Sequence, residues 1–409
     1  MPGEPPGPFP PSDLTPSGLV CPDLVGPDLV GRELVGPDLV GPDLVGRAAE
    51  TAAIRLMLDD ARLVTVTGPP GVGKTAVTLA AAGAAAGSFA DGSLLLRLDT
   101  LRDEILLPHT ILAALGLPDQ FTRGPLEMLT DQLRDRHLLL ILDTCEHLLG
   151  ACAGLVAALL PLCPKVQVLA TSREPLRVPG EAAMAVRPLW LTDAVRLFGQ
   201  RAAEAGAEPA PQNLAAVASI CVQLDKLPLA IELAAAELGQ LSLARLAEEQ
   251  PTTAALATTA ALAELLARLE AGQTSLGGSA RGSGQSGRHQ TLRAAIGWSH
   301  ELCTPSERLL WARLSVFTGP FGLRDAQDVC TTRQLSDETV AAALTLLAER
   351  SVLLSDRQAG GNPRFLLPVT LRTYGRQMLR QLDQEEEFLA RHQRWQEGRR
   401  HRYGAPTGK

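Results

Sequence analysis

The stretch RLVTVTGPPGVGKT, residues 62–75, decides the fold class of this chain. Its first six residues are rich in β-branched side chains, which is typical of a buried strand. The next eight, GPPGVGKT at 68–75, match the phosphate-binding pattern G-x-x-x-x-G-K-S/T. A helical segment, TAVTLAAAGAAA, follows at 75–86. Because a strand leads into the loop and a helix leaves it, a nucleotide-phosphate site is favoured over a chance glycine-rich turn.

Each part of this loop has a chemical task. The glycines let backbone N–H groups turn inward toward phosphate oxygens, with the positive end of the following helix behind them. Lys74 is expected to reach the β- and γ-phosphates of ATP, and Thr75 is expected to hold Mg²⁺. The predicted nucleotide-binding residues of the loop are Gly68, Pro69, Pro70, Gly71, Val72, Gly73, Lys74, Thr75 and Ala76.

Three more apolar runs predict buried strands: SLLLRL at 93–98, LLLIL at 138–142 and VQVLAT at 166–171. Continuous apolar runs separated by helical stretches indicate a parallel sheet covered on both faces. The amphipathic segment 48–60 predicts a helix before the first strand. The predicted fold is therefore α/β: a P-loop NTPase with a parallel sheet, followed by a helical lid and a winged-helix domain.

Composition and periodicity predict how the chain is divided. Beyond Pro188 the strand patterns give way to helical ones, and near the end three predicted helices are followed by a hairpin, SVLLSD and RFLLPV, which is the layout of a winged helix. The expected segments are a disordered Pro/Gly-rich repeat tail (1–44), a P-loop nucleotide-binding domain (45–187), a helical lid (188–270), a flexible linker (271–290), a winged-helix domain (291–384) and a charged tail (385–409).

A magnesium site needs a second oxygen ligand at the end of a neighbouring strand. Asp143 follows the run LLLIL directly and is the predicted ligand, alongside Thr75. The alternative is that Asp143 caps the following helix, a position where Asp is also favoured. Thr144 stands where many relatives of this fold class place a catalytic acid, and a hydroxyl is no base for the attacking water. Glu146 lies beyond the strand end and is a weak substitute.

Arg173 follows the last predicted strand. In doubly wound sheets the carboxyl ends of the strands face the crevice where ligands bind. Arg173 is therefore a candidate catalytic residue that senses the γ-phosphate, together with Lys74 and Asp143. The alternative, an exposed surface arginine, has equal weight from spacing alone.

The bulk composition limits the classes of partner. The formal net charge is −7, which argues against a nucleic-acid binder that depends on clustered Lys and Arg. The predicted recognition helix, DETVAAALTLLAER at 337–350, is also acidic, so direct DNA binding is not expected from this chain. The seven cysteines form no Cys-x-x-Cys pair. No run reaches the roughly 18 apolar residues of a membrane span. We expect a cytoplasmic protein without membrane contact that binds nucleotide and a protein partner or a second copy of itself.

Several segments together resemble the STAND class of signal-transduction ATPases, and most closely the NB-ARC-like module of actinobacterial SARP- and LuxR-type transcriptional regulators. The matching segments are RLVTVTGPPGVGKT, LLLILDTCEHLL, VLATSREPLRVPGE, AVRLFGQRA, CVQLDKLPLAIELAAAEL and QTLRAAIGWSHELCTPSERLLWARLSVFTGPFGL. The resemblance implies a P-loop core, a helical lid and a winged helix that closes over bound ADP or ATP. It also implies that Pro228 lies near the nucleotide.

This chain departs from the family pattern at several positions. Lys226 replaces the glycine of the lid motif, and Thr144 replaces the asparagine that commonly follows the strand aspartate. Pro368 and Val369 occupy positions where relatives carry the switch motif that reads ADP. The resemblance therefore leaves the reading of ADP in this chain, and the extent of hydrolysis, open.

A pentapeptide of the form Asp/Glu-Leu-Val-Gly-x recurs five times in residues 23–47. The predicted helix 48–60 and the strand 62–67 each span about 20 Å, so the chain leaves and returns to the same end of the sheet. Val45, Gly46 and Arg47 should then lie beside the phosphate loop, where the resemblance implies a box that packs against adenine. The copy GRE at 31–33 lacks the following helix and is expected to be a repeat expansion.

Three functions remain open at this level. The leading hypothesis is an ATP/ADP-binding regulatory switch in transcriptional regulation, with slow Mg²⁺-dependent ATP hydrolysis. The second is a housekeeping ATPase with a client substrate and fast turnover. The third is a truncated or decayed nucleotide-binding module that no longer switches.

Overall fold

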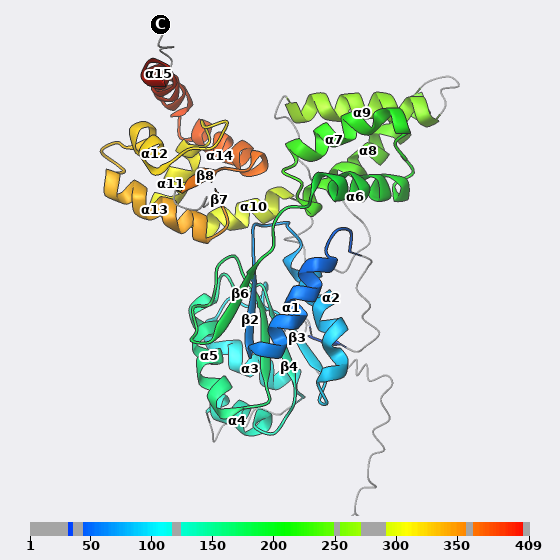
Figure 1. The fold of residues 1–409 in the computed structure, drawn as a ribbon, viewed down its shortest axis with the longest axis vertical. Helices are drawn as coiled ribbons and strands as arrows, with labels where there is room; N and C mark the ends of the chain where they lie inside the picture. The colour runs from blue at the N-terminus through cyan, green and yellow to red at the C-terminus, as the bar shows by residue number, and fades with distance from the viewer. Residues whose placement is uncertain are drawn as a thin grey trace, which may run out of the picture.

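Figure 1 shows the computed structural model of the chain. The structure describes residues 32–35, 44–116, 124–248, 254–270, 292–356 and 363–403. A sheet domain carries a bundle of helices, α6 to α9, on one side and a second helical group, α11 to α15, on the other, with α10 running between them (Figure 1). The predicted linker 271–290 lies outside the described residues.

The large sheet has the strand order β1-β3-β4-β5-β2-β6. All neighbouring pairs from β3 to β6 are parallel, and β1 is antiparallel to β3. The strands span Arg32–Val35 (β1), Leu63–Thr67 (β2), Ser93–Arg97 (β3), Leu139–Asp143 (β4), Gln167–Thr171 (β5) and Glu181–Ala185 (β6). The α/β fold with a mainly parallel sheet is thus confirmed, and the phosphate loop leaves β2 inside the sheet.

Helices cover both faces of this sheet, which explains the continuous apolar runs in its strands. Val64 of β2 packs in one core cluster with Ile54 and Val77, whereas Leu140 of β4 packs in a second cluster with Leu159. The helices of this domain span Ala48–Asp60 (α1), Lys74–Ala85 (α2), Leu107–Ala114 (α3), Pro125–Leu133 (α4) and Leu149–Leu162 (α5), with short 3-10 turns at Ala86–Ser88 (η1) and Glu104–Leu106 (η2).

The two edge strands differ from the sequence expectations. Residues 1–44 were expected to be disordered, and for Arg32–Val35 this is wrong, because these residues pair with β3. An edge strand has unpaired N–H and C=O groups, and a second strand satisfies them whatever its side chains are. At the other edge, β6 reads EAAMA and was not predicted. Alanine carries no strand signal, and β6 is held by its backbone pairing with β2.

The lid is a bundle of four helices. They span Leu191–Glu204 (α6), Leu214–Gln223 (α7), Pro228–Glu248 (α8) and Ala254–Glu270 (α9), and a 3-10 turn at Pro211–Asn213 (η3) precedes α7. Apolar side chains of α6, α7 and α8, such as Phe198, Ile220 and Ile231, are fully buried in the core cluster that also contains Val64. The core of the lid is therefore continuous with the core cluster that contains Val64 of β2.

The C-terminal part has helices followed by a hairpin, as a winged helix does. Its elements span Leu292–Glu301 (α10), Pro305–Leu314 (α11), Leu323–Cys330 (α12), Asp337–Glu349 (α13), Leu354–Asp356 (β7), Arg364–Leu366 (β8), Val369–Gln381 (α14) and Glu385–Tyr403 (α15). Helix α12 was not predicted. The second hairpin strand is also shorter than expected, because Pro368 is the N-cap of α14 and ends the extended segment. Within the described residues no helix has the length and apolar character to cross a membrane.

Candidate nucleotide-binding site

The phosphate loop joins β2 to α2, and Lys74 is the first residue of that helix. The Lys74 Nζ donates hydrogen bonds to the carbonyl oxygens of Gly68 at 2.9 Å and Pro69 at 3.2 Å. Burial, with a smaller contribution from Arg173, lowers the pKa of Lys74 to about 8, although Glu146 and Asp143 act in the opposite direction. Lys74 therefore lies beside a second cation and two carboxylates.

Asp143 ends β4 and lies against the loop. Its Oδ1 accepts hydrogen bonds from Thr75 Oγ1 at 2.7 Å and from Thr171 Oγ1 at 2.6 Å. Asp143 does not cap the following helix, since α5 begins at Leu149 without a side-chain cap, so the capping alternative is wrong. A hydroxyl and a carboxylate oxygen this close together are hard ligands of the kind Mg²⁺ takes. The donor set at Thr75 and Asp143 therefore fits the ion.

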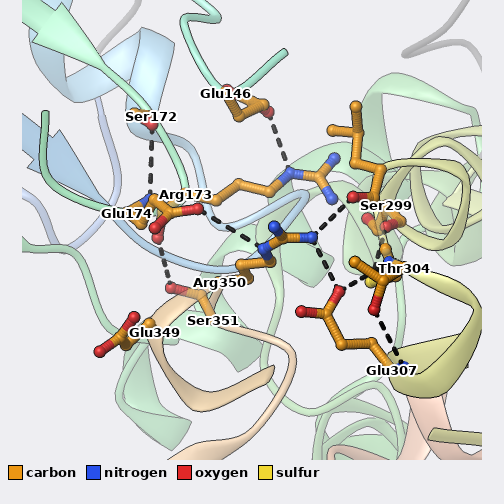
Figure 2. A network of polar contacts seen from close by, with 12 residues as sticks. Glu146, Ser172, Arg173, Glu174, Ser299, Thr304, Glu307, Glu349, Arg350 and Ser351 are labelled. Atoms are coloured by element: carbon orange, nitrogen blue, oxygen red, sulfur yellow. Dashed lines mark hydrogen bonds and ion pairs between the residues drawn. The ribbon is translucent and has the colours of Figure 1, made fainter. Parts of the chain in front are cut away.

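Arg173 follows β5 and is only 5% exposed, so the alternative of an exposed surface arginine is wrong. Its Nε donates to Glu146 Oε1 at 3.0 Å, and the side chains of this ion pair are 6% and 8% exposed (Figure 2). Burial acts to raise the pKa of Glu146, but Arg173 and Lys74 outweigh it and hold that pKa below its ordinary value. Glu146 thus lies at the phosphate site.

The last copy of the pentapeptide lies beside the loop. Arg47 is 5% exposed, and its Nη2 donates to the carbonyl oxygen of Val72 at 3.0 Å. Its Nη1 pairs with Glu50 at 2.6 Å. Gly46 has φ +70°, and a Cβ there would lie 2.5 Å from Asp193 Cγ at the start of α6. Only glycine fits this contact, so residues 45–47 are clamped between the phosphate loop and the lid.

The lid reaches the loop at a second point. Helix α8 starts at Pro228, and the Leu229 N–H donates to the Gly71 carbonyl at 3.1 Å. Gly71 has φ +75°, and a Cβ would lie 3.0 Å from the Leu229 Cβ. Lys226, which replaces the family glycine, has a left-handed backbone with φ +56°. The structure therefore brings residues 45–47, the phosphate loop and Pro228 together at one end of the sheet, with Asp143 and Arg173 on the phosphate side.

The winged-helix part contacts this site directly, through residues that the sequence did not single out. Ser351 Oγ donates to the Arg173 carbonyl at 3.0 Å. Arg350 pairs with Glu174 at 3.5 Å and with Glu307 at 2.9 Å (Figure 2). Glu307 in turn belongs to the capping box of α11. One polar network therefore connects Glu146 at the phosphate side with α11 of the winged domain.

A second contact joins the lid to α14. Asp225 accepts hydrogen bonds from the N–H groups of Val369 at 2.7 Å and Thr370 at 2.8 Å, and from Thr370 Oγ1 at 2.9 Å. Burial raises the pKa of Asp225, while these hydrogen bonds act to lower it. Val369 is one of the two altered switch positions, so the lid caps the helix that begins there. The only sequence signal for Asp225 is its place next to the lid motif KLPL.

Comparison with known proteins gives the family. Residues 304–380 match a model described as a winged helix-turn-helix domain. The chain is 35% identical over 353 residues to "Uncharacterized protein Rv0894" of Mycobacterium tuberculosis, covering 85% of this chain and 84% of the relative. The chain belongs to the family of that mycobacterial protein.

Other similar proteins are either longer than this chain or share less sequence identity with it. The chain is 38% identical over 329 residues to "Putative HTH-type transcriptional regulator Rv0890c" of Mycobacterium tuberculosis and spans 35% of that relative's length. Among solved structures, a STAND protein with a tetratricopeptide repeat sensor from Pyrococcus horikoshii shares 16% identity, covers 86% of this chain and 45% of its own, and has a TM-score of 0.35. A Walker-type ATPase of Pyrococcus abyssi shares 14% identity, covers 81% and 96%, and has a TM-score of 0.44.

These findings count against the expectation that this chain makes no direct contact with DNA. That expectation rested on the net charge of −7 and on the acidic helix α13, whose Asp337, Glu338 and Glu349 are exposed. The matched family is nevertheless a winged helix-turn-helix domain, and the longer relatives are named as HTH-type regulators. The expectation is therefore not upheld.

Proposed function

We propose that this protein is a nucleotide-controlled switch of the STAND class, similar to the NB-ARC-like modules of transcriptional regulators. The observation that carries this proposal is the contact between the phosphate side of the sheet domain and the winged helix, through Arg173 and Ser351. A phosphate loop whose neighbouring arginine touches another domain links nucleotide state to domain position. Residues 45–187, 188–270 and 291–384 would act as the nucleotide, lid and winged-helix bodies.

In this proposal ATP or ADP is held by the loop residues Gly68 to Ala76, with its adenine toward Val45, Gly46 and Arg47 and close to Pro228. Lys74 and Arg173 would bind the phosphates. Thr75 and Asp143 would hold Mg²⁺, which supplies charge neutralisation at the β- and γ-phosphates. The residues' own part is to orient the triphosphate and to exclude water by closing the lid over it.

Hydrolysis should be slow. Thr144 has no carboxylate to accept a proton from water, and the carboxylate of Glu146 is already paired with Arg173. A housekeeping ATPase would instead turn over within the usual enzyme range of about 1 to 1,000 per second. Steady-state phosphate release, with and without DNA, separates the two.

Nucleotide bound to the purified protein gives the primary test. Denaturation of wild-type protein should release ADP or ATP, and the Lys74→Ala variant should release far less. Equal release from both, or none from either, contradicts the proposal. A decayed module would bind nucleotide but show the same elution volume in size-exclusion chromatography with ADP and with a non-hydrolysable ATP analogue.

The family match makes DNA a second candidate ligand, as the target that the switch controls. Exposed arginines of the winged domain, Arg324, Arg333 and Arg364, would supply phosphate contacts beside the acidic α13. Fluorescence anisotropy with duplex DNA at two salt concentrations measures this. Salt-sensitive binding that depends on bound nucleotide supports a DNA-directed switch, and no binding in either nucleotide state removes DNA as its direct target.

A further inference from the structure

The phosphate side of the site holds two cations and, between them, an acid that the proposed function leaves unused. Glu146 pairs with Arg173 through Oε1 at 3.0 Å. The charge of Glu146 is also the strongest electrostatic influence on Lys74. Lys74 and Arg173 are the cations expected to bind the terminal phosphates. The Glu146 carboxylate therefore lies among the groups that would bind a γ-phosphate.

The second oxygen of this carboxylate is unsatisfied. Glu146 Oε2 is buried and has no hydrogen-bond partner among the described residues. The whole side chain is only 8% exposed, so water does not solvate this oxygen freely. A buried carboxylate oxygen without a donor costs free energy, so the site as it stands is not at its electrostatic optimum.

We propose that Glu146 is an internal counter-anion of Arg173 that sets the preference of the site between ADP and ATP. Its carboxylate occupies the place beside Arg173 that a γ-phosphate would take. The Glu146–Arg173 pair must therefore break before Arg173 can bind the γ-phosphate of a triphosphate. ADP, which ends at the β-phosphate, leaves the Glu146–Arg173 pair intact. This inference rests on the proposed nucleotide-binding function.

The pair also lies next to the contacts that dock the winged helix. While Glu146 holds the Arg173 side chain, the Arg173 carbonyl accepts from Ser351 and the adjacent Glu174 pairs with Arg350. A γ-phosphate that pulls Arg173 away from Glu146 would strain both contacts. Glu146 thus acts as a positioning residue whose partner, Arg173, touches the nucleotide.

The other role open to a carboxylate here is that of general base for the attacking water. The paired cations oppose it, because Arg173 and Lys74 hold the pKa of Glu146 below its ordinary value and so make it a weaker base. The two roles predict different effects of the same substitution, so one experiment separates them.

The test compares the binding of Mg-ADP and of a Mg-bound non-hydrolysable ATP analogue to the full chain, by titration calorimetry. Glu146→Gln keeps the shape and removes the charge. The ratio of the two dissociation constants should move toward the triphosphate by about ten-fold, since a like charge close to the γ-phosphate is removed. Glu385→Gln, which breaks the Arg376–Glu385 pair between α14 and α15, is the matched control and should leave the ratio unchanged.

The outcomes are distinct. If wild type binds nucleotide and the Glu146→Gln ratio equals that of the control, the counter-anion role is refuted while the proposed function stands. Unchanged affinities with lost ATP turnover would make Glu146 a proton acceptor and also refute it. No nucleotide binding by wild type overturns the proposed function itself. If Glu146→Gln does not fold, Glu146→Asp decides the matter, because its shorter carboxylate should shift the ratio the same way by a smaller factor.

Discussion

At the scale of single residues, the backbone of Thr144 is strained. It has φ +72°, a left-handed backbone that β-branched residues rarely adopt. The family resemblance places asparagine at this position, and asparagine tolerates that conformation. We therefore predict that Thr144→Asn raises the stability of the nucleotide domain by about 1 kcal/mol.

Denaturant unfolding of wild type and variant measures this gain. Thr144→Val is the matched control, because valine has nearly the same shape and keeps the β-branched strain. A gain for asparagine but not for valine fits the backbone explanation. Equal stability of wild type and Thr144→Asn would mean that the turn is unstrained.

The same turn explains which part of the site the sequence did not reveal. The phosphate loop, Asp143 and Arg173 follow from motifs and strand ends, which are local. Glu146 was set aside because it lies three residues past the strand. The left-handed turn at Thr144 redirects the chain, and the Cys145 N–H then donates to the Thr171 carbonyl at 2.9 Å, which holds this segment against the end of β5. A contact made by the turn between β4 and α5 has no period in the sequence.

At the scale of elements, apolar runs found the strands that are buried on both faces and missed those whose pairing alone holds them. The four inner strands, β2 to β5, read as Val- and Leu-rich runs. Strand β6 is alanine-rich, β1 lies in a repeat, and α12 is a short helix, LRDAQDVC, with few apolar residues. Edge pairing and short helices depend on tertiary contacts, which periodicity does not report.

The turn after α13 is the element that docks the winged helix on the phosphate side. Ser351 has φ +57° and donates its hydroxyl to the Arg173 carbonyl. Ser351→Gly keeps the backbone conformation and removes the hydroxyl, so it should weaken the docking by about 1 kcal/mol, the usual net value of one hydrogen bond. Limited proteolysis of the winged-helix domain should become faster, because the domain is held less tightly against the sheet domain.

Asp383 offers a control for this substitution. It has the same φ of +57°, is exposed, and lies in the turn between α14 and α15. Asp383→Gly therefore introduces the same backbone freedom without touching the interface. Equal proteolysis of both variants would show that the glycine, and not the lost hydroxyl, is responsible.

A cross-domain helix cap gives the second prediction at this scale. The Asp225 carboxylate in the lid accepts hydrogen bonds from the first two backbone N–H groups of α14. Asp225→Ala should destabilise the closed arrangement by about 1 to 2 kcal/mol, as other losses of an acidic N-cap do. Small-angle scattering should show a larger radius for this variant than for wild type. An unchanged radius would mean that α14 stays docked without its cap.

At the scale of the whole molecule, contacts that join the site to the winged helix include the Arg173–Ser351 hydrogen bond, the neighbouring Glu174–Arg350 pair and, through the lid, the Asp225 cap. Ligand that binds only the folded state stabilises it by about 2.7 kcal/mol at a concentration 100 times its dissociation constant. Because α8 begins at the loop with Pro228 and Leu229, and Asp225 precedes it, this stabilisation should extend to α14. We predict that ADP slows amide exchange at residues 369–373 as well as at 68–76.

The cap variant separates binding from coupling. In Asp225→Ala, ADP should still protect residues 68–76, since no atom of Asp225 lies among the predicted phosphate ligands, but residues 369–373 should exchange as fast with ADP as without it. Hydrogen exchange read by mass spectrometry resolves the two segments in one sample. Protection of α14 by ADP in the variant would mean that the contacts of Arg173 and Glu174 with the winged helix transmit the nucleotide state without the cap. No protection of α14 in wild type would show that the lid and the winged helix respond independently, and a switch built on their contact would then be ruled out.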